Sequence, residues 1–254
     1  MRATRSRLRR PPVSTPVTRF LRTPWRSRSA ARAVDKASLA TGVALVRALA
    51  AFDAETAEHS ATVALYARDV ALQLGADADS AAAIQLGALV HDVGKLALPA
   101  ALLLKAEPLD EDEWALVREH PEAGARIVAG LPSSHTLLAI VRHHHERVDG
   151  RGYPHGLRGS DIPAAARIVG ACDAYAAMTQ HRPYRASVAP DDAIAELRRN
   201  ADAQFDSEVV SALVWVLDAE GEDYRHARGA RFTAEHQHNE LAERTESEPQ
   251  AAAS

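Results

Sequence analysis

The chain has 254 residues, of which 46% are hydrophobic and 25% are charged, and it contains a single cysteine. This composition is typical of a globular protein with one sizeable core, it excludes an internal disulfide bond, and it fits a reducing cytoplasm. No apolar run approaches the roughly 20 residues that a membrane helix needs, so we expect no membrane span. Aromatic residues make up only 5% of the chain and alanine is abundant, which favours packed helices over sheets. We therefore expect an all-α fold.

Charge is distributed unevenly along the chain. The formal net charge is −4, yet residues 1–36 carry 11 basic residues and one acid, and the remainder has a balance of −14. Residues 1–33 are rich in Arg, Pro, Ser and Thr and lack hydrophobic periodicity, so we predict a disordered basic arm. We interpret this arm as a solvated tail rather than a binding site for nucleic acid or acidic lipid. The acidic remainder would repel an anionic substrate unless metal ions or local arginines offset its charge.

Helical periodicity begins at Asp35, with apolar residues recurring every three or four positions. Asp110 and Glu113 have the spacing of a helix-capping box, and Pro121 is well placed to open a helix. The periodicity, caps and helix breakers together predict helices near residues 35–52, 54–74, 79–92, 110–119, 121–130, 134–145, 163–178, 191–199 and 208–217.

Two stretches lack helical periodicity. Residues 149–159 contain four glycines and Pro154, which predicts a loop, and a loop of this length inside a compact domain is usually functional or disordered. From about Glu222 the chain is polar, and we predict a disordered tail over residues 222–254 that includes His236 and His238. The domain organisation expected from these patterns is a basic arm over residues 1–33, one helical domain over residues 34–221, and this tail.

Residues of types that can bind metals lie on five predicted segments, mostly at helix ends. Buried ionisable groups must be paired or bound to a metal, and imidazole mixed with carboxylate suits Fe, Mn or Zn. Seven or eight ligands exceed the need of one ion, whereas two ions that share a carboxylate fit the number and are typical of phosphoester hydrolysis. Each residue alone also fits a structural role, such as a salt-bridged helix end or a surface contact. The candidates are Glu55, His59, His91, Asp92, His120, His144, His145 and Asp173.

Two motifs make the pattern specific. The segment His91-Asp92-Val93-Gly94-Lys95, followed at residues 144–154 by HHERVDGRGYP, resembles the HD-GYP family of bacterial metal phosphohydrolases. The resemblance covers about residues 50–218 and includes RPYR at residues 182–185. It implies a multi-helix HD-superfamily bundle with a glycine-rich GYP loop. It also implies an enzyme in which metal-activated hydroxide attacks cyclic di-GMP, giving pGpG and in some members GMP.

The same resemblance implies a role for each matching residue. Seven of the eight candidate residues would bind two divalent ions, Fe or Mn, with Asp92 as the bridge, and the eighth, Glu55, would help to bind a third ion. Lys95 would stabilise or protonate a phosphate oxygen. The residues expected to contact the cyclic dinucleotide are Lys95, Tyr153, Arg182 and Arg185. Glu146 is a candidate for orienting the histidines, and its alternative role is a solvated acid at a helix end. A protein partner or a homodimer is left open.

The most serious departure from the family pattern is Ala176, where the family usually has an acid three residues after Asp173. Because Ala176 replaces none of the expected ligands and leaves Lys95 in place, we expect metal chemistry to persist while guanine recognition or rate changes. Two alternatives follow. One is a metal phosphohydrolase acting on another nucleotide or phosphoester. The other is a catalytically silent module that binds cyclic di-GMP or a protein, which the retention of every ligand disfavours.

Overall fold

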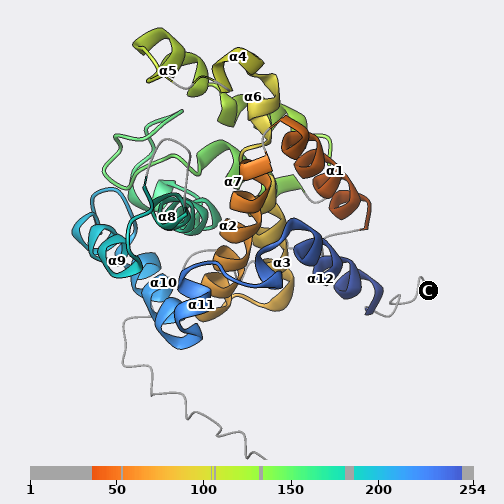
Figure 1. Cartoon of the computed structure of the whole chain (residues 1–254), viewed down its shortest axis with the longest axis vertical. Helices are drawn as coiled ribbons and strands as arrows, with labels where there is room; N and C mark the ends of the chain where they lie inside the picture. Colours follow the sequence, from red (N-terminus) through yellow and green to blue (C-terminus); the bar gives the residue numbers. More distant parts are fainter. Residues whose placement is uncertain are drawn as a thin grey trace, which may run out of the picture.

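The computed structural model describes residues 36–52, 54–103, 105, 107–131, 134–180 and 186–247, and these residues form helices and loops with no β-sheet (Figure 1). The predicted all-α fold is confirmed. The basic arm, Arg182 and Arg185 lie outside the described residues. In chain order the α-helices and the 3-10 helices (η) are α1 (Lys36–Phe52), α2 (Ala54–Gln73), α3 (Ala78–Leu89), η3 (Val93–Ala97), α4 (Ala100–Leu103), α5 (Glu111–Val117), α6 (His120–Val128), α7 (Ser134–His143), η4 (Gly159–Asp161), α8 (Ala164–Thr179), α9 (Pro190–Arg199), α10 (Ser207–Glu220), α11 (Glu222–Arg225), η5 (Ala230–Phe232) and α12 (Ala234–Ser247).

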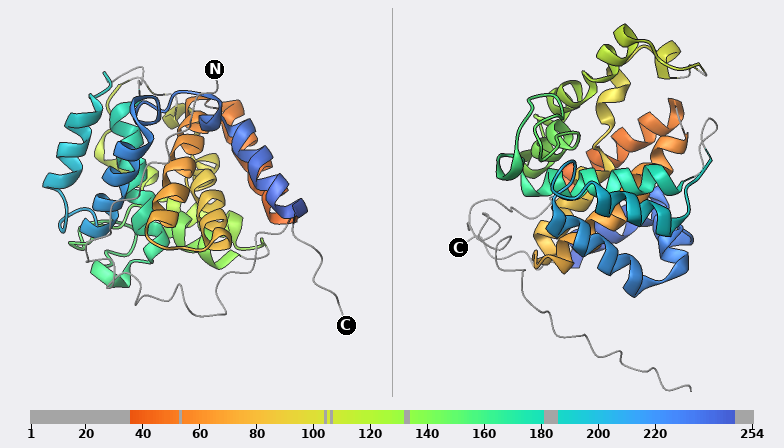
Figure 2. Two further views of the ribbon diagram at one scale, coloured as in Figure 1. Left: turned by 90° about the horizontal axis from the view of Figure 1, so that it is seen from below. Right: turned by 90° about the vertical axis from the view of Figure 1, so that its left-hand side faces the viewer.

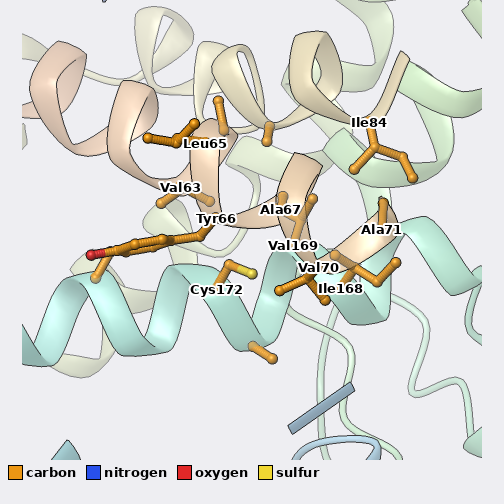
Figure 3. Close-up of a cluster of buried hydrophobic side chains, with 14 of the residues drawn as sticks. Val63, Leu65, Tyr66, Ala67, Val70, Ala71, Ile84, Ile168, Val169 and Cys172 are labelled. Carbon is orange, nitrogen blue, oxygen red and sulfur yellow. The ribbon is translucent and has the colours of Figure 1, made fainter. Parts of the chain in front are cut away.

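Helix α2 lies at the centre of the bundle and packs against α1, α3, α8, α10 and α12 (Figure 1). Most of its middle turns are fully buried, because small residues such as Ala61 and Ala64 let neighbouring helices approach on several sides. Figure 3 shows Tyr66 and Val70 of α2 facing Cys172 of α8 across this core. Burial of each large apolar side chain contributes about 1.5–3 kcal/mol to folding. The core therefore holds α2 and α8, which both carry site residues, in a fixed relation.

Local capping agrees with the sequence in several places. Asp110 and Glu113 form the predicted capping box at the start of α5, with both hydrogen bonds at 2.9 Å.

The structure of the His-Asp segment differs from the prediction in one respect. Helix α3 ends at Leu89, and the tighter helix η3 begins at Val93, so Lys95 follows Asp92 along a 3-10 turn rather than along the α-helix from which its position was predicted.

The predicted disordered tail is wrong for residues 222–247. These residues form α11, η5 and α12, and α12 lies beside α1 (Figure 2). The apolar side chains of Tyr224, Phe232 and Leu241 are buried, and the hydroxyl of Tyr66 donates to the carbonyl of Tyr224 at 2.8 Å. His236 and His238 belong to α12. The rings of Tyr224 and Phe232 both pack against that of Tyr66, so this polar segment is attached to the bundle at α2.

Among the helices of the described ranges, none is both long and apolar enough to cross a membrane.

Candidate metal centre

Two glycines let the segments that carry the candidate ligands approach closely. Gly94 lies against α6, where a Cβ atom would come within 1.8 Å of the carbonyl oxygen of His120. Gly170 of α8 lies against the end of α7, where a Cβ atom would come within 2.6 Å of the carbonyl oxygen of His144. Any side chain at either position would push these segments apart. The glycines therefore set the spacing between Asp92 and His120 and the spacing between α7 and α8.

The predicted ligands converge in two adjacent clusters, each with ligand atoms within 4.8 Å of one another. Asp92 stands between these clusters, since its Oδ1 lies 3.4 Å from Nε2 of His120 and its Oδ2 lies 3.4 Å from Nε2 of His91. The Nζ atom of Lys95 lies 2.6 Å from the same Oδ2. One carboxylate thus presents an oxygen to each cluster. The first cluster contains Asp92, His120, His144 and His145, and the second contains His59, His91 and Asp173.

Backbone carbonyls fix the proton position on three of the imidazoles. The Nδ1 atoms of His91, His120 and His144 lie 2.6, 2.7 and 3.1 Å from the carbonyl oxygen of the residue three positions earlier. A carbonyl oxygen only accepts hydrogen bonds, so each Nδ1 carries the proton and donates it. Each Nε2 is then left with a lone pair directed into the clusters, which is the form of histidine that binds metals.

Among the described side chains, hydrogen-bond donors do not satisfy all of these Nε2 lone pairs. Nε2 of His91 is buried without a hydrogen-bond partner, and Nε2 of His120 faces Nε2 of His144 at 3.4 Å. Buried polar atoms without partners are costly, and two opposed lone pairs repel each other. A cation held between them removes both costs. The donor set of imidazole nitrogen and carboxylate oxygen suits a divalent transition metal, so the residues present fit metal binding.

A side-chain relay that the sequence did not predict fixes the orientation of His59. The hydroxyl of Thr62 donates to a backbone carbonyl, so it accepts from Nε2 of Gln180, at 2.8 Å. This orients Oε1 of Gln180 toward Nδ1 of His59, which donates to it at 2.8 Å. Nε2 of His59 then faces Oδ1 of Asp173, also at 2.8 Å. A lone pair and a carboxylate are compatible at that distance only with a proton or a metal cation between them.

Burial and neighbouring charges keep most of these groups in the form that binds metals. Burial lowers the pKa of His145 to about 4 and that of His144 well below its ordinary value, so both rings are neutral at pH 7. Burial opposes ionisation of Asp92, but the charge of Lys95 and the neighbouring imidazoles of His91 and His120 outweigh it and hold the pKa of Asp92 well below its ordinary value. At neutral pH few protons therefore compete with a metal ion at His144, His145 and Asp92.

Glu146 anchors the glycine-rich loop of residues 149–159, the GYP loop. Its side chain is 0% exposed, and its two oxygens accept the backbone N–H groups of His155 at 2.7 Å and of Leu157 at 3.0 Å. The interpretation of Glu146 as a solvated acid is therefore wrong. The anchored loop places the ring of Tyr153 4.8 Å from that of His145. Tyr153 thus lies beside the first cluster.

A pocket of about 440 Å³ opens next to the clusters and includes His144, His145, Tyr153 and Asp173 in its lining. Its lining also includes Arg118, Arg147, Arg151 and Arg167. Ion pairs hold Arg147 to Asp149 at 2.8 Å and Arg167 to Asp206. With acids beside Arg147 and Arg167, the positive charge that would attract an anion into this acidic domain comes mainly from Arg118 and Arg151.

The structure thus gathers seven of the eight predicted ligands and places Lys95 and Tyr153 beside them. Glu55 is exposed one turn before His59, and among the described residues it belongs to neither cluster. Its role as a ligand of a third ion stays a prediction. Ala176 is fully buried in the core. Arg182 and Arg185 lie outside the described residues.

Comparison with known proteins agrees with this architecture. A family model described as HD domain matches residues 44–209. The chain is 37% identical over 172 residues to a cyclic di-GMP phosphodiesterase response regulator of Xanthomonas campestris pv. campestris, covering 67% of this chain and 46% of that protein. It is 36% identical over 169 residues to a 3'3'-cGAMP-specific phosphodiesterase of Vibrio cholerae, covering 66% and 37%. The chain thus spans less than half the length of these relatives.

A solved structure supports the fold. An HDG"Y"P protein from Bdellovibrio bacteriovorus matches with a TM-score of 0.53 and 24% identity, covering 64% of this chain and 52% of that chain.

Proposed function

Because the chain belongs to the HD domain family, as its HD-GYP motifs predicted, we propose that it is a metal-dependent phosphodiesterase that hydrolyses cyclic di-GMP to pGpG, with GMP as a further product. The observation that carries this proposal is the position of Asp92, whose two oxygens each lie 3.4 Å from a histidine of a different ligand cluster. A carboxylate shared in this way is the arrangement expected of a two-metal site for phosphoester hydrolysis.

We propose that the two clusters hold two divalent ions, Fe or Mn, with Asp92 as their common ligand. When bound, such ions lower the pKa of water and neutralise phosphoryl oxygens. Lys95 is the residue placed to act on the substrate itself. Its side chain is 28% exposed, and its Nζ can donate a hydrogen bond, or a proton, to a phosphate oxygen of the substrate.

We assign substrate binding to the pocket that Tyr153 and the arginines line. The ring of Tyr153 provides an apolar face next to His145, and the guanidinium of Arg118 lies 6.0 Å from its centre. Arg182 and Arg185 remain assigned to the phosphates of the dinucleotide by their place in the family motif. Planar guanidinium groups match the geometry of phosphate oxygens and bind them through paired hydrogen bonds.

A second candidate substrate is 3'3'-cGAMP, which the Vibrio cholerae relative carries in its name. The replacement of an expected acid by the buried Ala176 changes the surroundings of Asp173 and gives a physical reason to test base preference.

The test of this function is anaerobic purification, quantification of bound metal, and incubation with cyclic di-GMP, 3'3'-cGAMP or linear pGpG, followed by product identification. Hydrolysis of cyclic di-GMP that depends on the bound metal is the expected result. Preferential hydrolysis of 3'3'-cGAMP would select the second candidate. Metal-loaded protein that binds a cyclic dinucleotide without cleaving it would overturn the proposal in favour of a silent binding module.

Replacement of Gln180 by alanine is expected to weaken metal binding while leaving the fold intact. Without Oε1 of Gln180, nothing in the relay fixes the proton of His59 on Nδ1, and removal of a partner of this kind typically costs about 10–100-fold in metal affinity. Titration of metal-free protein with Mn²⁺ measures the effect. Gln180→Glu retains an acceptor and should retain the affinity. An alanine variant with wild-type affinity would contradict this role.

A further inference from the structure

A third group of potential metal ligands lies outside the site described above. It consists of His143 at the end of α7, Glu146 just after it, and His155 in the GYP loop, with ligand atoms within 4.8 Å of one another. From these residues we propose a separate zinc site that joins the GYP loop to the end of α7.

The first support for this site is the position of its atoms relative to one another. Nδ1 of His143 lies 3.9 Å from Oε1 of Glu146, and the rings of His143 and His155 have centres 5.3 Å apart. A distance of 3.9 Å is too long for a hydrogen bond, and a small side-chain rotation would bring it to the roughly 3.3–3.6 Å that separates two ligands about 2.0–2.2 Å from one tetrahedral zinc ion. These atoms converge without bonding to one another.

The second support is the lack of other partners at the buried end of the group. Nδ1 of His143 is buried and has no hydrogen-bond partner, which is costly unless the atom meets a cation or water. The carboxylate of Glu146 is fully buried and already held by two backbone N–H groups of the loop, so its oxygens are fixed in place. Each oxygen has a further lone pair. The inner half of the site is therefore formed before a metal arrives.

The third ligand closes the site from the surface. The side chain of His155 is 48% exposed, so its ring can turn toward His143 at little cost. Glu122 lies 3.6 Å from the same ring, but it pairs with Arg142 at 3.0 Å, and we leave it outside the ligand set. Two imidazoles and one carboxylate, with a fourth position open to water, form a donor set that zinc accepts.

Zinc at this site would restrain the loop that carries Tyr153. Glu146 already anchors the backbone of this loop, and a metal bond to His155 would add a side-chain anchor at the same place. Residues 149–159 would then open less often. The site is distinct from the catalytic clusters because none of its three residues belongs to them.

Zinc stoichiometry in buffered Zn²⁺ tests the proposal on the full chain. We expect wild-type protein to bind one more equivalent than His155→Ala, while His135→Ala, which removes an exposed histidine of α7, binds as much as wild type. His155→Cys supplies a thiolate ligand and should restore the lost equivalent, whereas His155→Asn should not. Because ions in the catalytic clusters are common to all these proteins, the difference between them reports this site alone.

Amide hydrogen exchange gives a second readout that does not depend on activity. Addition of Zn²⁺ should slow exchange at Leu157 and its neighbours in wild type and leave it unchanged in His155→Ala. Equal zinc stoichiometry in wild type and His155→Ala would overturn the proposal, as would a lost equivalent that His155→Cys fails to restore. The failure of phosphodiesterase assays would bear on the proposed function and leave this site unaffected.

Discussion

Replacing Asp92 with alanine is expected to abolish hydrolysis and to release bound metal. Both oxygens of this buried carboxylate face histidines, one in each cluster, at 3.4 Å, so the substitution removes a ligand from both of the proposed ions at once. Metal stabilisation of developing charge contributes several kcal/mol, and about 1.4 kcal/mol corresponds to a tenfold change in rate. We therefore expect kcat to fall on the order of 10³-fold or more. Elemental analysis after desalting, together with kcat on cyclic di-GMP, measures both effects.

Two variants separate this role from general damage to the fold. Asp92→Asn keeps the shape of the side chain and removes its charge, so it should fold like wild type and still lose metal and activity. Asp112→Ala removes an exposed acid from α5 and should behave as wild type. An Asn variant that retains its full metal content and turns over substrate at the normal rate would show that Asp92 is not the shared ligand.

The central part of this site could be predicted because its residues lie in two short motifs. His91, Asp92 and Lys95 lie within five positions of one another, and His144 and His145 are adjacent. Local geometry alone therefore keeps each group together. The sequence also marks Asp173 as an acid inside an apolar helix, which is costly to bury without a partner. Only the meeting of these segments required the fold.

The residues that form hydrogen bonds with these ligands or with their loop show no comparable pattern in the sequence. Gln180 and Thr62 are 118 positions apart, and a polar residue that faces an interior histidine looks the same in sequence as one that faces water. Glu146 was recognised as a candidate, but its anchoring of the loop depends on two N–H groups whose direction only the folded loop defines. Hydrogen-bond partners of ligands are thus harder to predict than ligands.

Helix α12 was missed for a related reason. Periodicity detects a stripe of apolar residues, whereas this helix is held largely through polar contacts. Gln237 is fully buried and bonds to Gln85, and Glu240 pairs with Arg68 at 2.5 Å. Leu241 adds one buried aliphatic side chain. Hydrophobic periodicity therefore cannot distinguish a segment with mainly polar buried contacts from a solvated tail.

Replacing Lys95 with methionine is expected to lower kcat by about 10²–10³-fold, the usual cost of removing one donor from developing negative charge. The metal content should stay the same, because Lys95 contacts Asp92 but is not itself among the candidate ligands. Methionine keeps an unbranched stem and removes only the charged end. Lys95→Arg retains the charge and should recover part of the rate. A methionine variant with unchanged kcat would contradict a role for Lys95 in the chemical step.

The competing explanation is that Lys95 only holds Asp92 in place, and the pH of the assay distinguishes the two. The charge of Lys95 helps to keep the pKa of Asp92 low, so its removal raises that pKa, and a protonated carboxyl cannot bind metal. The methionine variant should therefore lose metal at a higher pH than wild type as the solution is acidified. At pH 8, far above the ordinary pKa of an aspartate of about 3.9, Asp92 stays ionised in both proteins. A loss of kcat at pH 8 with full metal content can then arise only from the missing donor, whereas equal losses of metal and rate would assign Lys95 to the support of Asp92.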